Sequence, residues 1–236
     1  MWGREVNGIT LTFHLAGINN QNFLMRDEET GTYWQQISGR AISGPLAGSQ
    51  LRLIHSDELT LALWKSEQPR GTVLKDVAAF RSKYAPEDWD VKMKKTPTVL
   101  SYAGQGLAPR DLMLGVHAGG DARAFRFDDV LKEKLIEDRV GPEPVLLVVG
   151  ADGESVRAFS RRLPNGTAVA DFYRALDSNA GRALMMDSVT GSRWNFRGCA
   201  TEGPRTGECL EKVEAIKDYW FDWRNYNPKT TVFRRQ

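Results

Sequence analysis

The stretch DSVTGSRW, residues 187–194, decides the fold, because residues 27–34 read DEETGTYW. Each carries an Asp, then Thr-Gly from the third position beyond it and Trp at the seventh. The stretch GCATEGPRTG, residues 198–207, matches GRAISGPLAG, residues 39–48, in the same way. The first pair of motifs is separated by 160 positions and the second pair by 159. The sequence therefore predicts an internal duplication of one structural unit.

Length and composition indicate a folded chain that can bury a sizeable core, with 236 residues of which 41% are hydrophobic. It carries 32 Lys and Arg against 30 Asp and Glu, and the net charge is only +2. A field this weak predicts no nucleic-acid partner and no attraction to an anionic membrane. No apolar run approaches the ~20 residues needed to span a bilayer, so we expect a soluble chain. A strand-like segment begins almost at Met1 without a signal peptide, so we expect a mature form or a truncated chain.

Turn signals and alternating apolar residues predict antiparallel hairpins in both copies. Asn7-Gly8 and Asn165-Gly166 are strong short hairpin signals, because both turn residues must adopt positive φ. A helix is expected after each Gly-Pro loop. In the first copy it covers residues 59–64 with Ser56 as the N-cap, and in the second it covers residues 216–223.

The remaining residues have no counterpart in the first copy. Residues 75–110 suggest a connector with one short helix near residues 77–84. Further elements are expected as a hairpin over 112–127, a helix over 128–139, and strands at 145–149 and 156–159. Because nothing equivalent precedes residue 27, the first copy is expected to lack its front half.

These patterns predict a strand-rich α+β fold. It would consist of two related units of antiparallel hairpins, each with a helix, related by a pseudo-twofold internal repeat. The predicted boundaries are 1–74 for the first repeat unit, 75–110 for the connector and 111–236 for the second, complete unit. We expect one compact body.

The chain resembles the prokaryotic family called domain of unknown function 3179. Residues 187–194, 198–207 and 220–230 carry the resemblance, together with Leu-Gly-Val and Ala-Arg-Ala-Phe within residues 114–125. The resemblance covers most of the chain apart from the connector and implies no activity. Many members carry a Cys-Pro-x-Cys-Gly segment after a buried strand, whereas residues 148–152 hold no Cys here. A redox or metal role of that segment is therefore not carried over.

Asp27 and Asp187 have two interpretations. Such residues commonly accept hydrogen bonds from their own turn, but either could be a catalytic carboxylate. His14 and His117 are candidate partners in that case. A zinc or copper centre would need all three scattered histidines, including His55, to converge. No cofactor and no metal site is predicted.

Cys199 and Cys209 are the only cysteines and flank the second Gly-Pro loop, where the first copy has Arg40 and Gln50. If the flanking arms are paired strands, the thiols can meet in a disulfide. Two free buried thiols and a metal site remain open as alternatives. A disulfide would favour a compartment outside the reducing cytosol.

Three further residues are weak candidates for binding. Trp89 and Trp220 do not belong to the Trp positions that recur in both copies, so they are freer to stack on a ligand. Arg123 could clamp an anion. The Trp residues that recur at 34, 64, 194 and 223 are expected to pack the core.

Two function classes remain open. The first is a non-catalytic extracytoplasmic domain, periplasmic or secreted, that binds a small ligand or an envelope protein between its repeat units. The second is an enzyme or metal-dependent redox protein with Asp and His residues in that groove. A structural module of a larger envelope protein is a third option. The reaction, the ligand and the oligomeric state are not predicted.

Overall fold

The computed structural model describes residues 1–19, 21–100, 106–166, 168–175 and 184–234, and the structural statements below concern these residues. They form two compact units, each assembled from three segments of the chain. Unit 1 comprises Met1–Asp57, Pro97–Asp111 and Asp218–Lys229, and unit 2 comprises Glu58–Thr96, Leu112–Lys217 and Thr230–Gln236. The predicted boundaries at residues 74 and 110 describe sequence copies and stay a prediction, as does the pseudo-twofold repeat.

Unit 1 is built on small antiparallel sheets. Strands β1 (Glu5–Val6) and β2 (Ile9–Thr10) form the expected hairpin, in which Asn7 and Gly8 have φ values of 51° and 78°. A four-stranded sheet follows in chain order, with β3 (Phe13–Asn19), β4 (Asn22–Asp27), β5 (Tyr33–Gln35) and β6 (Ala41–Ser43). Its core gathers around Trp34, with Leu11 and Leu51 fully buried beside it.

Helix α4 (Trp220–Tyr226) belongs to unit 1, far in sequence from the sheet it accompanies. Asn22 Nδ2 donates to Asp222 Oδ2 at 2.7 Å, and Tyr226 Oη donates to the carbonyl oxygen of Asn19 at 3.3 Å. The backbone N–H of Trp220 donates to Asp111 O at 2.9 Å. These bonds fix the helix on the residues of unit 1.

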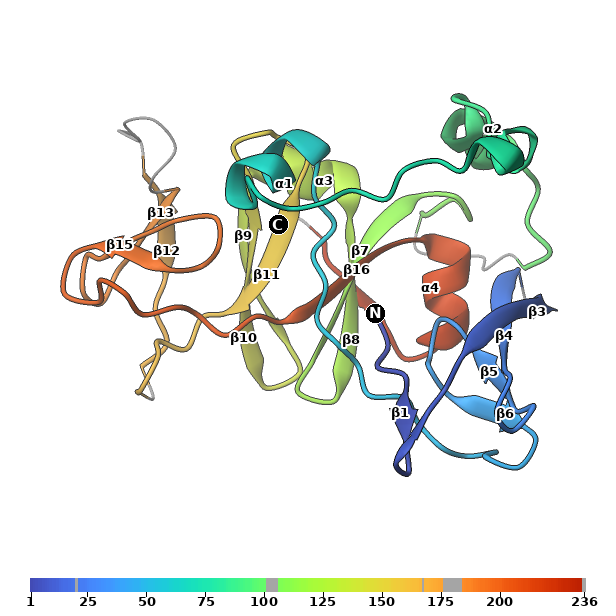
Figure 1. Cartoon of the computed structure of the whole chain (residues 1–236). Coiled ribbons are helices and arrows are strands. Elements are labelled where there is room, and N and C mark those ends of the chain that lie inside the picture. Colours follow the sequence, from blue (N-terminus) through green and yellow to red (C-terminus); the bar gives the residue numbers. More distant parts are fainter. Residues whose placement is uncertain (20, 101–105, 167, 176–183, 235–236) are drawn as a thin grey trace. The chain divides into compact units, whose positions relative to one another are not determined.

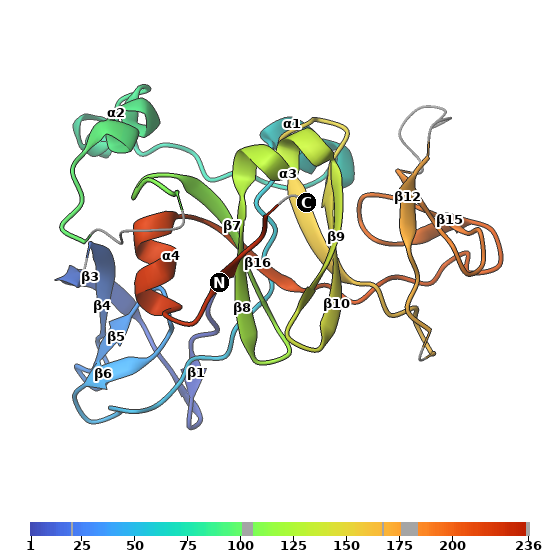
Figure 2. The same cartoon turned by 180° about the vertical axis from the view of Figure 1, so that it is seen from behind.

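Unit 2 contains three sheets, whose strands are drawn in Figures 1 and 2. The first has the order β16-β7-β8-β17, from β7 (Leu112–Ala118), β8 (Asp121–Arg126), β16 (Glu214–Tyr219) and β17 (Thr231–Val232). The last two residues of β16, Asp218 and Tyr219, already belong to unit 1. The second is the meander β9 (Leu135–Val140), β10 (Glu143–Val149) and β11 (Val156–Ser160). The third joins β12 (Phe172–Arg174), β13 (Met185–Asp187), β14 (Arg193–Trp194) and β15 (Ala200–Glu202).

Strand β10 is buried on both faces, which explains its unbroken apolar run. Its residues Val145, Leu147 and Val149 enter the core that β7, β8 and α3 (Phe127–Glu133) enclose. The alternate residues Leu146 and Val148 enter a second core with residues of β12 to β15. Because side chains alternate along a strand, only a continuous apolar run can serve two cores.

The remaining helices of unit 2 are short. They are α1 (Leu61–Glu67), the 3-10 helix η1 (Ala78–Lys83) and α2 (Trp89–Lys95). Helices α1 and α3 lie at the same end of strands β9 to β11 (Figures 1 and 2). The short helix expected near residues 77–84 is confirmed as η1, whereas α2 was not predicted. Part of the predicted connector, residues 101–105, lies outside the described residues.

The helix predicted over residues 128–139 is wrong in its second half. Helix α3 ends at Glu133, and Lys134 adopts a φ of 67°, which a continuing right-handed helix excludes. The chain then enters β9, where Ile136 and Val140 are buried and Arg139 is exposed. The sequence contains no Gly or Pro at this helix end, because Lys134 occupies the left-handed position.

The two helices expected after the Gly-Pro loops begin later than predicted. The second starts at Trp220, because residues 216 and 219 belong to β16. The first starts at Leu61 and is capped by Thr60 rather than Ser56. The strand-rich α+β class and the hairpins β1–β2 and β7–β8 are confirmed. At the turn predicted over Asn165-Gly166, the structure describes an isolated antiparallel bridge between Arg162 and Val169, and residue 167 lies outside the described residues.

Candidate functional site

The carboxylate of Asp27 is bound within its own turn. Its Oδ1 accepts from the backbone N–H of Thr30 at 2.6 Å and from the Thr30 hydroxyl at 2.8 Å. Its Oδ2 accepts from Trp34 Nε1 at 2.8 Å. Burial alone would raise the pKa of Asp27, but the hydrogen bonds from Trp34 and Thr30 outweigh it and lower the pKa.

Asp187 makes the corresponding bonds in unit 2. Its Oδ1 accepts from the N–H of Thr190 at 2.5 Å and of Val189 at 3.0 Å, and its Oδ2 accepts from Trp194 Nε1 at 2.9 Å. The pKa of Asp187 is likewise lowered, because bonds from Thr190 and Trp194 outweigh burial. Both residues are 1% exposed, and their carboxylates anchor the two turns through these hydrogen bonds.

The candidate histidines are not hydrogen-bonded to either carboxylate in the described bonds. His14 is exposed on β3 and His117 is exposed on β7. The catalytic roles proposed for Asp27, Asp187, His14 and His117 therefore gain no support from geometry and stay predictions.

The two Gly-Pro loops close onto these turns. The N–H of Leu46 donates to Thr32 Oγ1 at 3.1 Å, and the N–H of Arg205 donates to Ser192 Oγ at 3.0 Å. Gly203 has a φ of 94°, and a Cβ there would lie 2.7 Å from the Cα of Ser192. Only glycine allows this approach.

The two cysteines form a disulfide. Cys199 and Cys209 are antiparallel bridge partners with a Cα separation of 3.9 Å. In unit 1 the equivalent backbone β-bridge joins Arg40 and Gln50. Gln50 Nε2 donates to Ser38 O at 2.8 Å. The disulfide interpretation therefore replaces the free-thiol and metal alternatives.

The three candidate binding residues lie in different surroundings. Trp89 is 50% exposed at the first position of α2, and Trp220 is 2% exposed at the start of α4. Arg123 lies on β8, where its Nε is 2.6 Å from Asp138 Oδ2 on β9. Ligand stacking on the Trp220 ring is disfavoured by its burial. The charge of Arg123 is neutralised by Asp138, so an anion clamp gains no support.

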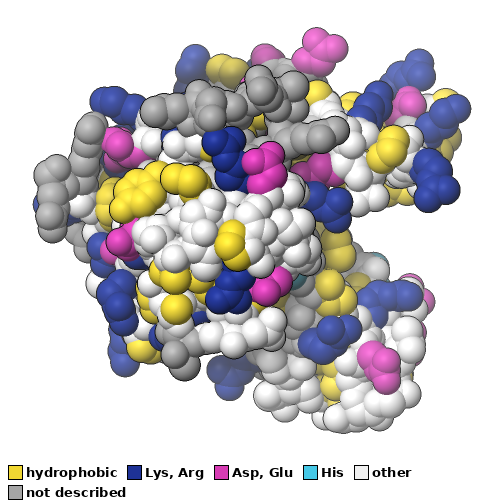
Figure 3. Space-filling view, turned by 90° about the vertical axis from the view of Figure 1, so that its left-hand side faces the viewer, with side chains coloured by type: hydrophobic (Ala, Val, Ile, Leu, Met, Phe, Trp, Pro, Cys, Tyr) yellow, Lys and Arg dark blue, Asp and Glu magenta, His cyan; other side chains and the backbone are white. Residues whose placement is uncertain are grey.

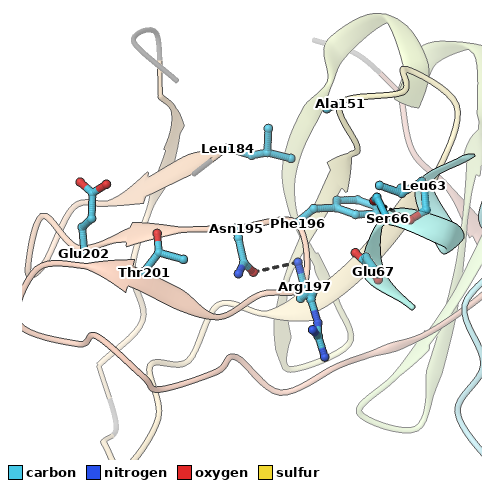
Figure 4. A pocket seen from close by; sticks show the side chains of 10 residues that line it. All are labelled: Leu63, Ser66, Glu67, Ala151, Leu184, Asn195, Phe196, Arg197, Thr201 and Glu202. Atoms are coloured by element: carbon cyan, nitrogen blue, oxygen red, sulfur yellow. Dashed lines mark hydrogen bonds between the residues drawn. The ribbon is translucent and has the colours of Figure 1, made fainter. Parts of the chain in front are cut away.

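A groove of about 660 Å³ opens in unit 2 beside α1 and was not foreseen from the sequence. It is lined by residues of α1, of the turn after β10, of the segment from β14 to β15 and by the residue before β13 (Figure 4): Leu63, Ser66, Glu67, Ala151, Leu184, Asn195, Phe196, Arg197, Thr201 and Glu202. Apolar and polar side chains both contribute to it.

A buried ion pair supports the groove. Arg157 of β11 binds Glu67 of α1 through two hydrogen bonds, Nη1 to Oε1 at 2.7 Å and Nη2 to Oε2 at 2.8 Å. The guanidinium lies 4.5 Å from the ring centroid of Phe196. The Arg157 side chain is 5% exposed and that of Glu67 is 14% exposed. Two charges so deeply buried depend on each other, so the pair holds α1 in position.

The other end of α1 is fixed by a hydrogen-bonded cap. The Thr60 hydroxyl accepts from the N–H of Leu63 at 3.2 Å and donates to Asp152 Oδ2 at 2.7 Å. Burial would raise the pKa of Asp152, but bonds from Ser155 and Thr60 lower it. The cap therefore fixes the orientation of α1, which forms part of the wall of the groove.

The walls of the groove differ at its two ends. Phe196 projects toward α1, near Leu63 and Ser66, whereas Thr201 and Glu202 lie at the far end (Figure 4). Asn195 Oδ1 accepts from the N–H of Arg197 at 2.9 Å, which fixes the orientation of the amide. The groove thus offers an apolar end and hydrogen-bonding groups that include both an Arg and carboxylates.

A pair of acidic residues in unit 1 is the second feature that sequence reasoning missed. Asp218 is the second-to-last residue of β16, and Asp222 lies in the first turn of α4. Burial and the negative charge of Asp222 raise the pKa of Asp218 to about 8. Burial also raises the pKa of Asp222, although the Asn22 hydrogen bond and the Arg110 charge oppose that rise. The sequence signal for this pair is that two Asp residues lie on either side of Trp220 in an aromatic-rich segment.

The described residues contain no grouping of three or more His, Cys, Asp or Glu side chains suited to a metal ion. No helix in the described part of the chain is long and apolar enough to cross a membrane. On the face drawn in Figure 3, basic and acidic side chains are interspersed.

Comparison with known proteins completes the description. A search of the curated proteins and of the solved structures found no match to this chain. One family model, described as "protein of unknown function (DUF3179)", matches residues 1–230. The match includes both Asp-Trp turns, both Gly-Pro loops and the α1 groove. The chain therefore belongs to the DUF3179 family.

Proposed function

We propose that this chain is an extracytoplasmic, non-catalytic domain that binds a small polar ligand in the α1 groove of unit 2. The observation that carries the proposal is the buried pair of Arg157 and Glu67 packed on Phe196. A rigid support keeps the lining side chains in place before a ligand arrives, which lowers the entropy cost of binding.

The groove lining indicates the class of ligand. Arg197 is exposed, and carboxylates from Glu67 and Glu202 line the same space. Leu63 and Phe196 add apolar surface at one end. A ligand with an apolar portion and hydrogen-bonding groups of both polarities, such as an amino acid, a short peptide or a saccharide, would match this lining.

The turn that contributes Ala151 adds a further reason. It lies within residues 148–152, where the family resemblance leads us to expect a cysteine-bearing segment in many members. The groove lies next to that segment, so we infer that this part of the surface is functional in the family. In this chain its function would not involve a cysteine.

The compartment is inferred from the disulfide. Disulfides persist in oxidising compartments and are rare in the cytosol, so Cys199 and Cys209 favour a periplasmic or secreted location. The prediction of a ligand or envelope partner between the repeat units stays a prediction.

We also infer an internal duplication. The matched hydrogen bonds of Asp27 and Asp187, and the edge-on packing of Phe13 on Trp34 and of Phe172 on Trp194, support it. The enzyme alternative based on Asp27 or Asp187 lacks such support, because both carboxylates are engaged in their turns.

Thermal shift measurements with amino acids, dipeptides and monosaccharides as probes would test the proposed site. Thr201→Trp would fill the groove, whereas Thr206→Trp introduces the same bulk outside its lining. We expect a probe that raises the melting temperature of the wild type and of Thr206→Trp but not of Thr201→Trp. A stabilising probe that acts equally on both variants would refute the site, and no response to any probe would refute the ligand class.

A further inference from the structure

Three buried polar atoms around the start of α4 have no hydrogen-bond partner among the described residues. They are Asp218 Oδ2, Trp220 Nε1 and Asp222 Oδ1. Trp220 is 2% exposed and Asp222 is 8% exposed, and Asp218 is half-buried with its Oδ2 atom inaccessible, so bulk water does not satisfy the three atoms. Buried polar atoms are nearly always paired, and such a concentration of exceptions in five residues requires an explanation.

The two carboxylates have unequal surroundings. Asp222 accepts from Asn22 Nδ2 at 2.7 Å through its other oxygen. Arg110 adds positive charge, and its guanidinium lies 5.0 Å from the ring centroids of both Tyr219 and Phe221. Within the described part of the chain, the backbone N–H of Tyr219 is the one donor to Asp218, at 2.7 Å. The negative charge of Asp222 is therefore better stabilised than that of Asp218.

Two other charged residues of unit 1 are connected to this segment, Asp111 through a backbone hydrogen bond to Trp220 and Arg224 through its place in α4. Asp111 accepts from the N–H of Trp220 through its carbonyl oxygen, and its carboxylate accepts from the N–H of Ala108 at 3.0 Å. Arg224 lies in the last turn of α4, where its Nη1 is 3.4 Å from the carbonyl oxygen of Asn227. Neither group has a described hydrogen bond to Asp218.

We propose that Asp218 and Asp222 form a buried carboxylate pair that binds one proton at neutral pH, with the proton held mainly by Asp218. Two buried anions near each other repel, and one proton removes that repulsion. A protonated Asp218 also gains an O–H donor, while Asp222 Oδ1 is an acceptor that lacks a donor.

The direction of the pKa shifts agrees with this geometry. The pKa of Asp218 is raised to about 8 by burial and by Asp222. Because the groups are coupled, the measured titration belongs to the pair and not to one residue alone. At neutral pH the pair then carries one negative charge, which Arg110 and Asn22 stabilise.

Proton binding here makes folding depend on pH. The unfolded chain releases the Asp218 proton near the ordinary value of 3.8, whereas the folded state keeps it up to about pH 8. Between these values the folded state binds more protons, so stability falls as pH rises, and it levels off above the folded pKa. Asp222 lies in α4, and its hydrogen bond from Asn22 helps to hold that helix. Loss of the proton leaves two repelling carboxylates, so we expect it to weaken the packing of α4.

The test compares thermal unfolding of the wild type, Asp218→Asn and Glu28→Gln from about pH 5 to about pH 9. Asn keeps the side-chain shape without a proton to lose, and Glu28 is an exposed carboxylate of the same unit. We expect the melting temperature of the wild type and of Glu28→Gln to fall across this range, with a clearly flatter profile for Asp218→Asn. A profile of Asp218→Asn that parallels the wild type would overturn the proposal.

A spectroscopic measurement keeps the proposal testable if Asp218→Asn does not fold. Infrared difference spectra of the wild type between acidic and basic pH should contain the C=O band of a protonated carboxylic acid that is present at neutral pH and disappears as pH rises through about 8. Asp222→Asn should move that transition to lower pH, because the repelling charge is gone. A wild-type protein without the band at about pH 6 would contradict a shared proton.

Discussion

Trp34 and Trp194 each donate an indole N–H to an Asp seven residues earlier. The spacing alone predicted that the Asp residues belong to turns, because Thr-Gly follows at the third position. It did not predict the indole bond, since that contact needs two strands folded back on each other around the turn. By sequence the same motif could also be a catalytic site, and the burial and the hydrogen bonds of both carboxylates favour the turn interpretation.

Acid should destabilise the protein through these turns. The folded-state pKa of Asp187 lies below the ordinary 3.8, so between these two values the unfolded chain binds more protons. The stability that Asp187 provides is thus present above about pH 3.8 and is lost as pH falls through the folded pKa. Urea unfolding of the wild type should therefore give a midpoint that declines in this acidic window.

Asp187→Asn should be less stable at neutral pH and should lose part of the acidic decline. The neighbouring Ser188→Ala leaves the carboxylate in place and serves as the control. An Asp187→Asn variant with the full decline of the wild type would contradict the assignment.

At the scale of elements, the predictable parts were those with local signals. The hairpins at Asn7-Gly8 and over β7 and β8 follow from turn residues and alternation. Strands β9 and β16 were mistaken for helix, because charged residues within them mask the alternation. Their strand conformation depends on pairing with β10 and β7, which lies outside the local sequence. The α1 groove likewise depends on Glu67 meeting Arg157 across 90 positions.

The Gly-Pro loop of unit 1 should accept a second disulfide. Arg40 and Gln50 are antiparallel bridge partners, as Cys199 and Cys209 are in unit 2. Arg40→Cys combined with Gln50→Cys should therefore oxidise to a bridge and raise the free energy of unfolding by up to about 3 kcal/mol. Mass spectrometry after alkylation without reductant measures the bridge, and urea unfolding measures its effect.

Two comparisons control this experiment. Each single Cys variant should take up one alkyl label. Cys199→Ser with Cys209→Ser removes the native bridge and should cost about as much as the new one adds. Two labels on the double-Cys variant would show that the two loops are not equivalent.

At the scale of the whole molecule, each compact unit draws on segments from both halves of the sequence. Helix α1 follows the first copy of the motifs but belongs to unit 2, and α4 follows the second copy but belongs to unit 1. Sequence comparison recognised the copies because they share local turns. It could not assign the helices, because their partners are set by contacts across long distances in the chain, such as Asn22 with Asp222.

Cleavage within residues 68–92, which are exposed, should not release a separate domain. Unit 2 needs α1 from before the cut, held by Arg157 and Asp152, and unit 1 needs α4 from after it. Brief trypsin treatment should give two fragments that coelute on native size exclusion and separate in denaturant. Separate elution under native conditions would contradict this interleaved assembly.

The double burial of β10 also bears on aggregation. Residues 145–149 read VLLVV, an uncharged apolar run of high β-propensity that would pair readily with other chains when exposed. In the fold both its edges are covered by β9 and β11 and both its faces by cores. Glu143 and Pro144 before it, and Asp152 after it, are the kinds of residue that interrupt such pairing in an unfolded chain. The strand that joins two cores is thus also a segment whose exposure before folding the chain needs to limit.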